Sequence, residues 1–271
     1  MGTLGTTALR SSDHDGLTAG DHPAAPLLRR LSSIAPLPEE DRTLVESDLI
    51  DARSLAAHAP CIRQGHVPRQ VFVVVEGWMM RWQILPDGSR QVTGFLLPGD
   101  FCNDPASVDH GFDSGVSALG PARVAALAPG AMERWYARPA LQRALEWARH
   151  ADHMVQRSWI VSIGRRDAYT RLAYLLCQLH ARLGPLADAH GFALPATQEH
   201  LADALGLTPV HVNRVLKRLR EDGLVDIRRA RVHFDEVAAL RDRAGFSDRD
   251  VHLGPAALTP PEKGAWSPTL A

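Results

Sequence analysis

Cysteine is scarce in this chain, with three residues in 271, and no two of the three are close together. Cys61, Cys102 and Cys177 lack the short spacings that are typical of disulfide frameworks, zinc sites and cysteine-held iron–sulfur clusters. The sequence therefore favours a reducing compartment, and we expect a cytoplasmic protein.

Long apolar runs and an excess of charge are also missing. No apolar run approaches the roughly 18 residues that a membrane span needs, and the first residues lack the apolar core of a signal peptide. Lysine and arginine number 30 against 31 aspartates and glutamates, so a net charge of −1 gives no bulk attraction to a polyanion. A polyanionic partner has to be met by a local basic surface.

The length of the chain is sufficient for two domains, each with its own core. Residues 1–25 are rich in small polar side chains without apolar periodicity, and residues 247–271 hold four prolines and few large apolar side chains. We expect both tails to be disordered.

Residues 71 to 127 carry the pattern of short strands. Val71–Glu76 is a β-branched run, and the residues that follow Gly77 alternate with period 2 up to Ile84. Asp87–Gly88 suits a tight hairpin turn because both residues accept positive φ angles. Partner strands are predicted at 91–97, 115–119 and 122–128. Many short strands at regular spacing predict a barrel or jelly roll.

From about residue 139 the apolar period becomes that of a helix. Small and apolar residues recur three and four positions apart: Leu141, Ala144, Ala148, Ala151 and Val155. This stripe predicts one long helix over residues 139–165, which either packs on the core of its own domain or pairs with the same helix of a second copy. A second helix is predicted over about 167–183, ended by Gly184–Pro185.

Two further helical patterns follow one another between Gln198 and Arg220. Thr197 and Thr208 are suitable N-caps for them, and Pro209 occupies the first position of the second helix, where its missing N–H costs nothing. Gly206 stands between the two patterns. Two short helices joined by a turn containing glycine are the pattern of a helix-turn-helix motif.

The second of these helices has an apolar side and a basic side. The apolar side carries Val212, Val215, Leu216 and Leu219. The outer side is predicted to carry Pro209, Val210, His211, Asn213, Arg214, Lys217 and Arg218. Such a helix fits the major groove of DNA.

Each outward residue suits a different part of DNA. Arg214 can donate two hydrogen bonds to a guanine, and Pro209 and Val210 can touch a thymine methyl group. His211 and Asn213 can bond base edges or phosphates. Lys217 and Arg218 lie further from the groove floor and are expected at phosphates.

Local charge and a basic hairpin support DNA as the partner. Residues 163–233 hold 11 lysines and arginines against 7 acidic residues, an excess of four positive charges. Arg228, Arg229 and Arg231 stand between two short apolar runs, which predicts a hairpin wing with a basic tip suited to phosphates.

These residues resemble the Crp/Fnr group of bacterial transcription regulators over about residues 27–240. The strongest likeness is Leu201–Val225, with Val212 and Arg214 in the spacing of that group's winged helix-turn-helix. The turn Asp87–Gly88 and the stretch Pro98–Phe101 are placed as in its cyclic-nucleotide-type β-roll.

The resemblance implies an α+β fold in three parts. These are an N-terminal β-roll or jelly roll at 26–138, a dimerisation helix at 139–165 and a winged helix-turn-helix at 166–240. It also implies a homodimer, double-stranded DNA with a palindromic operator, a hinge near Gly164–Asp167, an effector pocket in the β-roll and RNA polymerase as a further partner. The predicted DNA-contacting set is Thr197, Gln198, Thr208, Pro209, Val210, His211, Asn213, Arg214, Lys217, Arg218, Arg228, Arg229 and Arg231. Within it, Thr197 and Gln198 are placed at phosphates by the resemblance alone.

The chain departs from the group at the effector pocket, which is predicted to hold Phe101, Cys102, Asp104, Asp113 and Ser114. Members that bind cyclic AMP have an Arg-Ser pair where this chain has Phe112 and Asp113. A carboxylate there repels a phosphate. We therefore expect no cyclic nucleotide, and the effector is an unknown small molecule or a redox signal.

Other cofactors of the group are not expected either. Its iron–sulfur members have closely spaced cysteines near the N-terminus, whereas the first cysteine here is Cys61. His58, His66, His110 and Cys102 are iron ligands by type, but a chain with 13 histidines places some in the sensor by chance, and we expect no haem or metal. Cys102 is either a redox-sensitive thiol or a small apolar filler.

Two other classes of function compete with transcription regulation. An enzyme lacks support because the chain has no P-loop, G-x-S-x-G elbow, H-E-x-x-H pair or dinucleotide-binding glycine pattern. A β-roll regulatory module that acts through protein partners is the alternative. DNA binding weakens steeply as salt rises, which separates the two.

Overall fold

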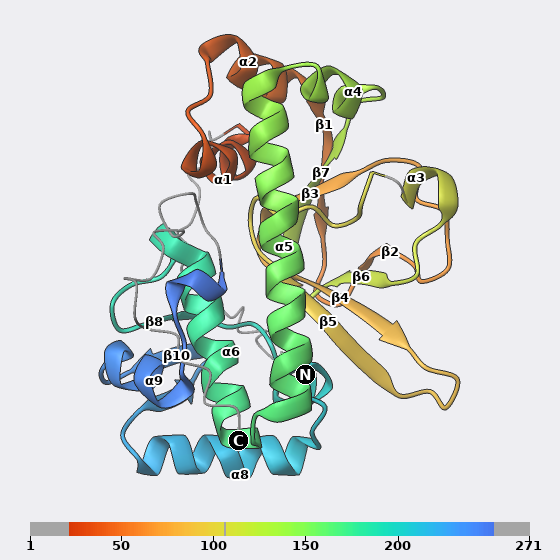
Figure 1. The fold of residues 1–271 in the computed structure, drawn as a ribbon. Helices are drawn as coiled ribbons and strands as arrows, with labels where there is room; N and C mark the ends of the chain where they lie inside the picture. Colours follow the sequence, from red (N-terminus) through yellow and green to blue (C-terminus); the bar gives the residue numbers. More distant parts are fainter. Residues whose placement is uncertain (1–21, 106, 252–271) are drawn as a thin grey trace, which may run out of the picture.

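The computed structural model describes residues 22–105 and 107–251, in two folded parts connected by the long helix α5 (Figure 1). The helices are α1 (Ala25–Ile34), α2 (Glu39–Asp48), α3 (Ser107–His110), α4 (Ala131–Tyr136), α5 (Pro139–Arg165), α6 (Ala168–Leu183), α7 (Gln198–Leu205), α8 (Pro209–Glu221) and α9 (Val237–Ala244), with 3-10 turns at Gly184–Leu186 and Asp248–Asp250. The strands are β1 (Leu49–Leu55), β2 (Pro60–Ile62), β3 (Phe72–Glu76), β4 (Met79–Ile84), β5 (Arg90–Leu96), β6 (Gly115–Ala118), β7 (Ala122–Leu127), β8 (Gly191–Ala193), β9 (Val225–Arg228) and β10 (Arg231–Phe234).

The N-terminal part is the predicted β-roll. Its antiparallel strands form two sheets, in the orders β1-β7-β3 and β2-β6-β4-β5. The predicted hairpin is β4 and β5, in which Arg81 pairs with Gly94 and Trp82 with Val92, so a bulge interrupts the register. The strands β1 and β2 were not predicted, because most residues of β1 are exposed and show no apolar alternation.

Two glycines of this part allow other backbone segments to lie in close contact with them. Gly77 has φ +74°, and a Cβ built on it would lie 2.4 Å from the carbonyl oxygen of Pro121. Gly99 has φ +94°, and its Cβ would lie 2.7 Å from the carbonyl oxygen of Pro26 on α1. Only glycine fits both the positive φ and the missing space. The Pro98–Phe101 stretch therefore lies directly against the first helix.

Besides the short α3, three helices of the β-roll part were not anticipated from the sequence. α1, α2 and α4 cover the end of the β-roll, and α1 lies beside the N-terminal half of α5 (Figure 1). Leu27, Leu28 and Leu31 of α1 are buried in one cluster with Leu141 and Ala144 of α5. The expectation of a disordered tail up to residue 25 is wrong at its end, because Ala24 is fully buried; residues 1–21 lie outside the described part.

Helix α5 spans the residues predicted for the long helix. Its small-residue stripe packs on the core of its own domain, which is the first of the two predicted arrangements. Leu141, Ala144 and Ala148 pack against α1 and the β-roll of the same chain. A different set, Ile160, Val161 and Ile163, is exposed near the C-terminal end of α5. Among the described residues no helix is both long enough and apolar enough to cross a bilayer.

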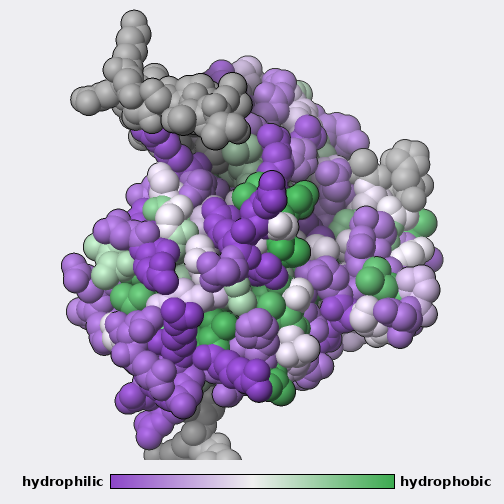
Figure 2. Space-filling model, turned by 60° about the horizontal axis from the view of Figure 1, so that its bottom comes forward, coloured by the Kyte–Doolittle hydropathy of each residue, from purple (hydrophilic) through white to green (hydrophobic). Residues whose placement is uncertain are grey.

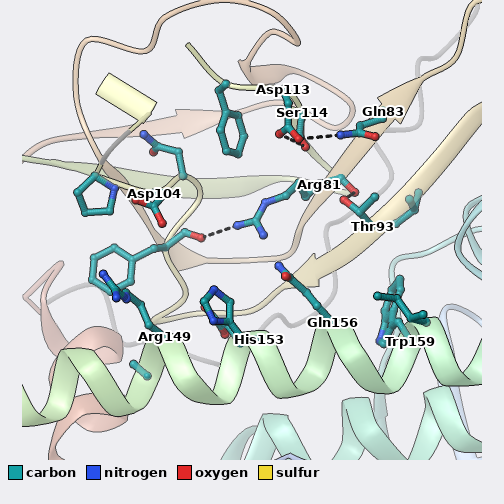
Figure 3. Close-up of a pocket in the computed structure, with 18 of the residues that line it drawn as sticks. Arg81, Gln83, Thr93, Asp104, Asp113, Ser114, Arg149, His153, Gln156 and Trp159 are labelled. Carbon is teal, nitrogen blue, oxygen red and sulfur yellow. Dashed lines mark hydrogen bonds between the residues drawn. The ribbon is translucent and has the colours of Figure 1, made fainter. Parts of the chain in front are cut away.

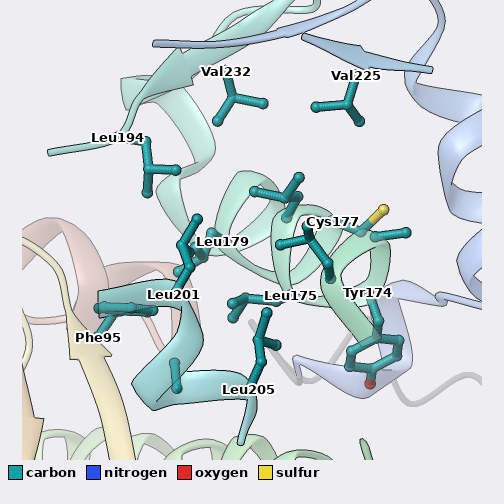
Figure 4. Packing of buried hydrophobic residues seen from close by; sticks show 14 of the residues in the cluster. Phe95, Tyr174, Leu175, Cys177, Leu179, Leu194, Leu201, Leu205, Val225 and Val232 are labelled. Carbon is teal, nitrogen blue, oxygen red and sulfur yellow. The ribbon is translucent and has the colours of Figure 1, made fainter. Parts of the chain in front are cut away.

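The C-terminal part is a winged helix-turn-helix. Helices α6, α7, α8 and α9 pack around a core with a three-stranded sheet in the order β8-β10-β9. In Figure 4 leucines of α6 and α7 face Val225 and Val232 of the wing. The expectation of a disordered tail from residue 247 is wrong at its start, because Ser247 caps the 3-10 turn and Val251 is buried; residues 252–271 lie outside the described part.

The two parts share a continuous apolar core. Trp78 of the β-roll stacks on Phe192 at 6.2 Å, and Phe95 of β5 meets Trp159 of α5 edge to face at 5.9 Å. Figure 4 shows Phe95 in the same cluster as Leu201 and Leu205 of α7. The first helix of the helix-turn-helix is thus packed directly on a strand of the β-roll.

A buried ion network adds a polar connection between the same parts. Asp100 accepts hydrogen bonds from Arg182 of α6 (Nη2–Oδ2 2.6 Å) and from the backbone N–H of Leu97 (2.8 Å), and it forms an ion pair with Arg30 of α1. Arg30 also binds Asp152 of α5 (Nη2–Oδ1 2.8 Å). The side chains of Asp100 and Arg182 are 7% and 9% exposed. The orientation of α6 on the β-roll therefore depends on this network.

Replacing Arg182 with methionine tests how strongly the network holds the two parts. Methionine keeps the apolar stem but leaves the buried Asp100 with one arginine fewer, so we expect a loss of about 3 to 5 kcal/mol in the free energy of unfolding. Urea denaturation followed by tryptophan fluorescence measures it. The control is Lys217→Met, which breaks an exposed pair with Glu221 and should cost about 0 to 1 kcal/mol. Equal losses in the two variants would contradict the structural role of Arg182.

Candidate DNA-binding surface and sensor cavity

The ends of α7 and α8 are fixed by their own residues. The Thr197 hydroxyl accepts from the backbone N–H of His200 (3.2 Å), and Nδ1 of His200 accepts from the N–H of Thr197 (3.2 Å), which closes a capping box. Gly206 ends α7 at φ +63°. The Thr208 hydroxyl accepts from the N–H of His211 (3.2 Å). Both predicted caps are confirmed, and they set the angle between the two helices.

Helix α8 presents the predicted side to solvent. Val212, Val215 and Leu219 are buried, whereas Val210 is 63% exposed. In Figure 1 α8 lies across the end of the molecule opposite α1 and α2, and Figure 2 looks onto this end, where most of the surface is hydrophilic. A helix exposed along one side at the end of a molecule has the geometry needed to enter a groove.

The polar residues of α8 differ in whether another side chain of the protein already binds them. Arg214 has no carboxylate or hydrogen-bond partner among the described residues. Lys217 forms only an exposed pair with Glu221 at 3.6 Å, and Arg218 stacks on the ring of Tyr169 at 4.9 Å. Asn213 donates to Oε1 of Gln198 at 3.3 Å, so two residues that are predicted to contact DNA are hydrogen-bonded to each other.

The predicted wing is formed by β9 and β10, with Arg229 and Ala230 at its tip. Both tip residues have positive φ angles, 50° and 56°, as in the tight turns that suit hairpins. Arg228 and Arg231 are paired with Asp226 and Asp188, while Arg229 has no partner among the described residues. Arg229 is therefore the wing arginine most available to a phosphate.

The sensor part contains a cavity of about 520 Å³ between the β-roll and α5. Figure 3 shows Arg81, Gln83 and Thr93 entering it from β4 and β5, and Arg149, His153 and Gln156 from α5. Four of the five predicted pocket residues line it: Phe101, Asp104, Asp113 and Ser114. The two carboxylate oxygens of Asp113 accept from Gln83 (3.0 Å) and from Ser114 (2.8 Å).

Cys102 is not among the lining residues, so its predicted place in the pocket is wrong. Phe101 and Asn103 face the cavity, whereas Cys102 is fully buried on the other side, in a cluster with Val116 and Val124. His58 is also away from the cavity, with its ring 5.8 Å from that of His200. The side chain of His110 lies outside the described part.

The cavity has polar residues that the sequence reasoning missed. Arg81 donates to the carbonyl oxygens of Phe101 (3.4 Å) and Cys102 (3.3 Å), and its Nε is buried without a partner among the described residues. The alternation of β4 already placed Arg81 and Gln83 on one face, which was a usable signal. Arg149, His153 and Gln156 of α5 also recur at helical spacing. In the described part no group of three metal-ligand side chains occurs.

Comparison with known proteins covers both parts. The model of Crp-like helix-turn-helix domains matches residues 170–243, and that of cyclic nucleotide-binding domains matches residues 52–138. The transcriptional activator protein FnrL of Cereibacter sphaeroides is 32% identical over 202 residues, which cover 71% of this chain and 80% of FnrL. The chain belongs to the Crp/Fnr family of transcription regulators. The predicted resemblance and the DNA-binding function are thereby confirmed.

Other relatives agree with this assignment. The nitrogen fixation regulation protein FixK of Bradyrhizobium diazoefficiens is 35% identical over 156 residues, 57% of this chain and 65% of FixK, so the match spans slightly less than two thirds of that protein. The structure of FixK2 from Bradyrhizobium japonicum superposes with a TM-score of 0.63 at 22% identity, over 73% of this chain and 98% of that one, which shows the shared fold. Regulators of this family bind DNA as dimers.

The capping box of α7 makes the regulator sensitive to acid. Burial lowers the pKa of His200 below its ordinary value of 6.5, and Arg90 and His58 lower it further. Folding therefore opposes protonation of His200, and stability is lost as the pH falls below 6.5 towards the lowered value. A protonated ring also cannot accept from Thr197 at Nδ1.

We expect the urea concentration at which half of the regulator is unfolded to be lower at pH 5.5 than at pH 7.5. In His200→Gln, glutamine can close the same capping box without titrating, so the fall should be smaller. Equal pH dependence in the two proteins would contradict the role of His200.

Proposed function

We propose that this regulator binds a palindromic operator as a homodimer, with α8 in the major groove, under the control of a signal received at the β-roll. The observation that supports it most is that Arg214, which has no partner among the described residues, and the apolar Val210 are both exposed on one capped helix. Two such helices, related by a twofold axis, suit two half-sites about one helical turn apart.

The dimer contact is proposed along α5. Trp147, Met154 and Val161 recur every seven residues, which is the spacing of a helix pair that winds around its copy. The first two are half-buried and Val161 is 52% exposed. They lie on a side of α5 other than the Leu141–Ala148 stripe, which is used within the chain.

RNA polymerase is proposed as the further partner, because FnrL and other relatives carry the name of transcriptional activators. A bacterial regulator meets DNA in the cytoplasm, so we infer that location. We also infer that the chain is not an enzyme, since its relatives are regulators and its polar cavity is accounted for by a sensor role.

We infer that the cavity takes an effector other than a cyclic nucleotide. Phe112 and Asp113 lie on its wall, and the guanidinium of Arg81 is occupied by two backbone carbonyl oxygens. The unpartnered Nε of Arg81 can still donate to an acceptor group of a small polar molecule. We propose no haem, iron–sulfur cluster or other metal in the sensor.

Base reading by α8 can be tested with Arg214→Ala. Selection of binding sequences from a random pool should return a palindrome for the wild type and a palindrome relaxed at one position per half-site for the variant. The loss at the best site should be about 1 to 3 kcal/mol. Lys217→Ala is the matched control, with a uniform loss across sequences and a salt slope lower by about 1. A uniform loss in Arg214→Ala, or salt-independent binding by the wild type, would contradict the proposal.

Cyclic AMP itself tests the nature of the effector. We expect that cyclic AMP at about 1 mM, well above typical micromolar ligand affinities, changes neither operator affinity nor tryptophan fluorescence, since Trp159 lines the cavity and reports on its contents. A saturable change in either signal would show that the cavity accepts the nucleotide despite Asp113.

A further inference from the structure

Two of the three cysteines, 41 positions apart in the chain, are brought together on the side of residues 101–103 that faces away from the cavity. Cys61 lies in β2, where the pairing with β6 is irregular, and Cys102 follows the bridge between Val73 and Phe101. Cys61 packs against the buried cluster that contains Cys102, so the two thiols are neighbours. Cys61 is half-buried and Cys102 fully buried.

An arginine stands beside the more accessible thiol. Nη2 of Arg53, on β1, lies 3.7 Å from the sulfur of Cys61, and the Arg53 guanidinium rests on the ring of Phe72 at 4.9 Å. The neighbouring Cys102 thiol and the Arg53 guanidinium together hold the pKa of Cys61 below its ordinary value, although burial opposes them. The neighbouring Cys61 and burial raise the pKa of Cys102. A thiolate next to a positive charge is the reactive form of cysteine.

We propose that Cys61 and Cys102 form a reversible disulfide when the regulator encounters hydrogen peroxide, with Cys61 oxidised first. The Cys61 thiolate attacks one peroxide oxygen, the O–O bond breaks, and the products are a sulfenic acid on Cys61 and a hydroxide that takes up a proton to become water. The Cys102 sulfur then attacks the Cys61 sulfur and releases its own proton. The sulfenic oxygen leaves as a second water, so two thiols and one peroxide yield one disulfide and two waters.

The disulfide is connected to the sensor cavity through the backbone of residues 101–103. An S–S bond is about 2.05 Å long, much shorter than a contact between two unbonded sulfur atoms, so oxidation must bring Cys102 and β2 closer together. The Cys102 carbonyl oxygen accepts from Arg81 in the cavity, and its neighbours Phe101 and Asn103 line that cavity. Oxidation on one side of this segment therefore changes the cavity on the other. The effect on DNA binding rests on the proposed function; the disulfide does not.

Thiol counting and mass spectrometry on the full-length chain test the disulfide. After mild peroxide the wild type should lose two of its three thiols and 2 Da, with Cys61 and Cys102 in one cross-linked peptide pair. Cys177, buried in α6 with its pKa raised by burial to about 12, is the internal control and should stay reduced. In Cys102→Ser, Cys61 should stop at the sulfenic acid, trapped by dimedone. Three free thiols after treatment, or cross-links through Cys177 or between chains, would overturn the proposal.

A second variant avoids any folding defect of the cysteine mutants. Arg53→Gln removes an exposed charge beside Cys61 and should slow disulfide formation several-fold, whereas Arg69→Gln, at another exposed arginine of the β-roll, should not. Equal rates in the two variants would contradict the activated thiolate. Operator affinity measured before and after oxidation should change in the wild type and not in Cys102→Ser. A fully formed disulfide with unchanged affinity would refute the link to the cavity while leaving DNA binding itself intact.

Discussion

The carboxylate of Asp100 is the constraint on which the arrangement of the two parts depends. A buried carboxylate is costly unless opposite charges and hydrogen bonds surround it. Its partners come from two separate segments, Arg30 in α1 and Arg182 in α6. Because Arg30 also binds Asp152 of α5, one acidic group of the β-roll fixes the first helix, the long helix and the DNA-binding part together. Apolar packing alone lacks this directionality.

The placement of residues 101–103 depends on the contacts of Asp100. Asp100 is held on one side, and Asn103 bonds the backbone of Phe72 (3.0 Å) and Gln70 (3.2 Å) on the other, so the segment between them is rigid. Phe101 and Asn103 face the cavity, and Cys102 lies on the other side, in the cluster against which Cys61 packs. Under the two proposals, a small molecule would reach this segment from the cavity and an oxidant would reach it from the side of Cys61.

The sequence predicted the features that short-range chemistry decides. The caps Thr197 and Thr208, the turn at Gly206 and the exposed side of α8 depend on neighbours within a few residues, and the structure has them as predicted. The features missed depend on contacts between distant segments. The alternation of β4 puts Arg81 on the same face as Gln83, but nothing local shows that α5 covers that face, and nothing local pairs Cys61 with Cys102. The α5 stripe left two arrangements open for the same reason, because its partner α1 is more than 100 residues away.

The contact of β5 with α7 provides a physical route from the cavity to the DNA-reading helix. Gln91 of β5 lines the cavity and also donates to the carbonyl oxygen of Ala204 in α7 (3.4 Å), while the adjacent Arg90 binds Asp203 (2.7 Å). Close-packed elements shift as units, because their contacts tolerate few intermediate positions. Helix α7 in turn holds α8 through the bond between Gln198 and Asn213. A displacement of β5 would therefore be passed to α7 and, through the contacts of α7 with α8, to the second helix of the pair.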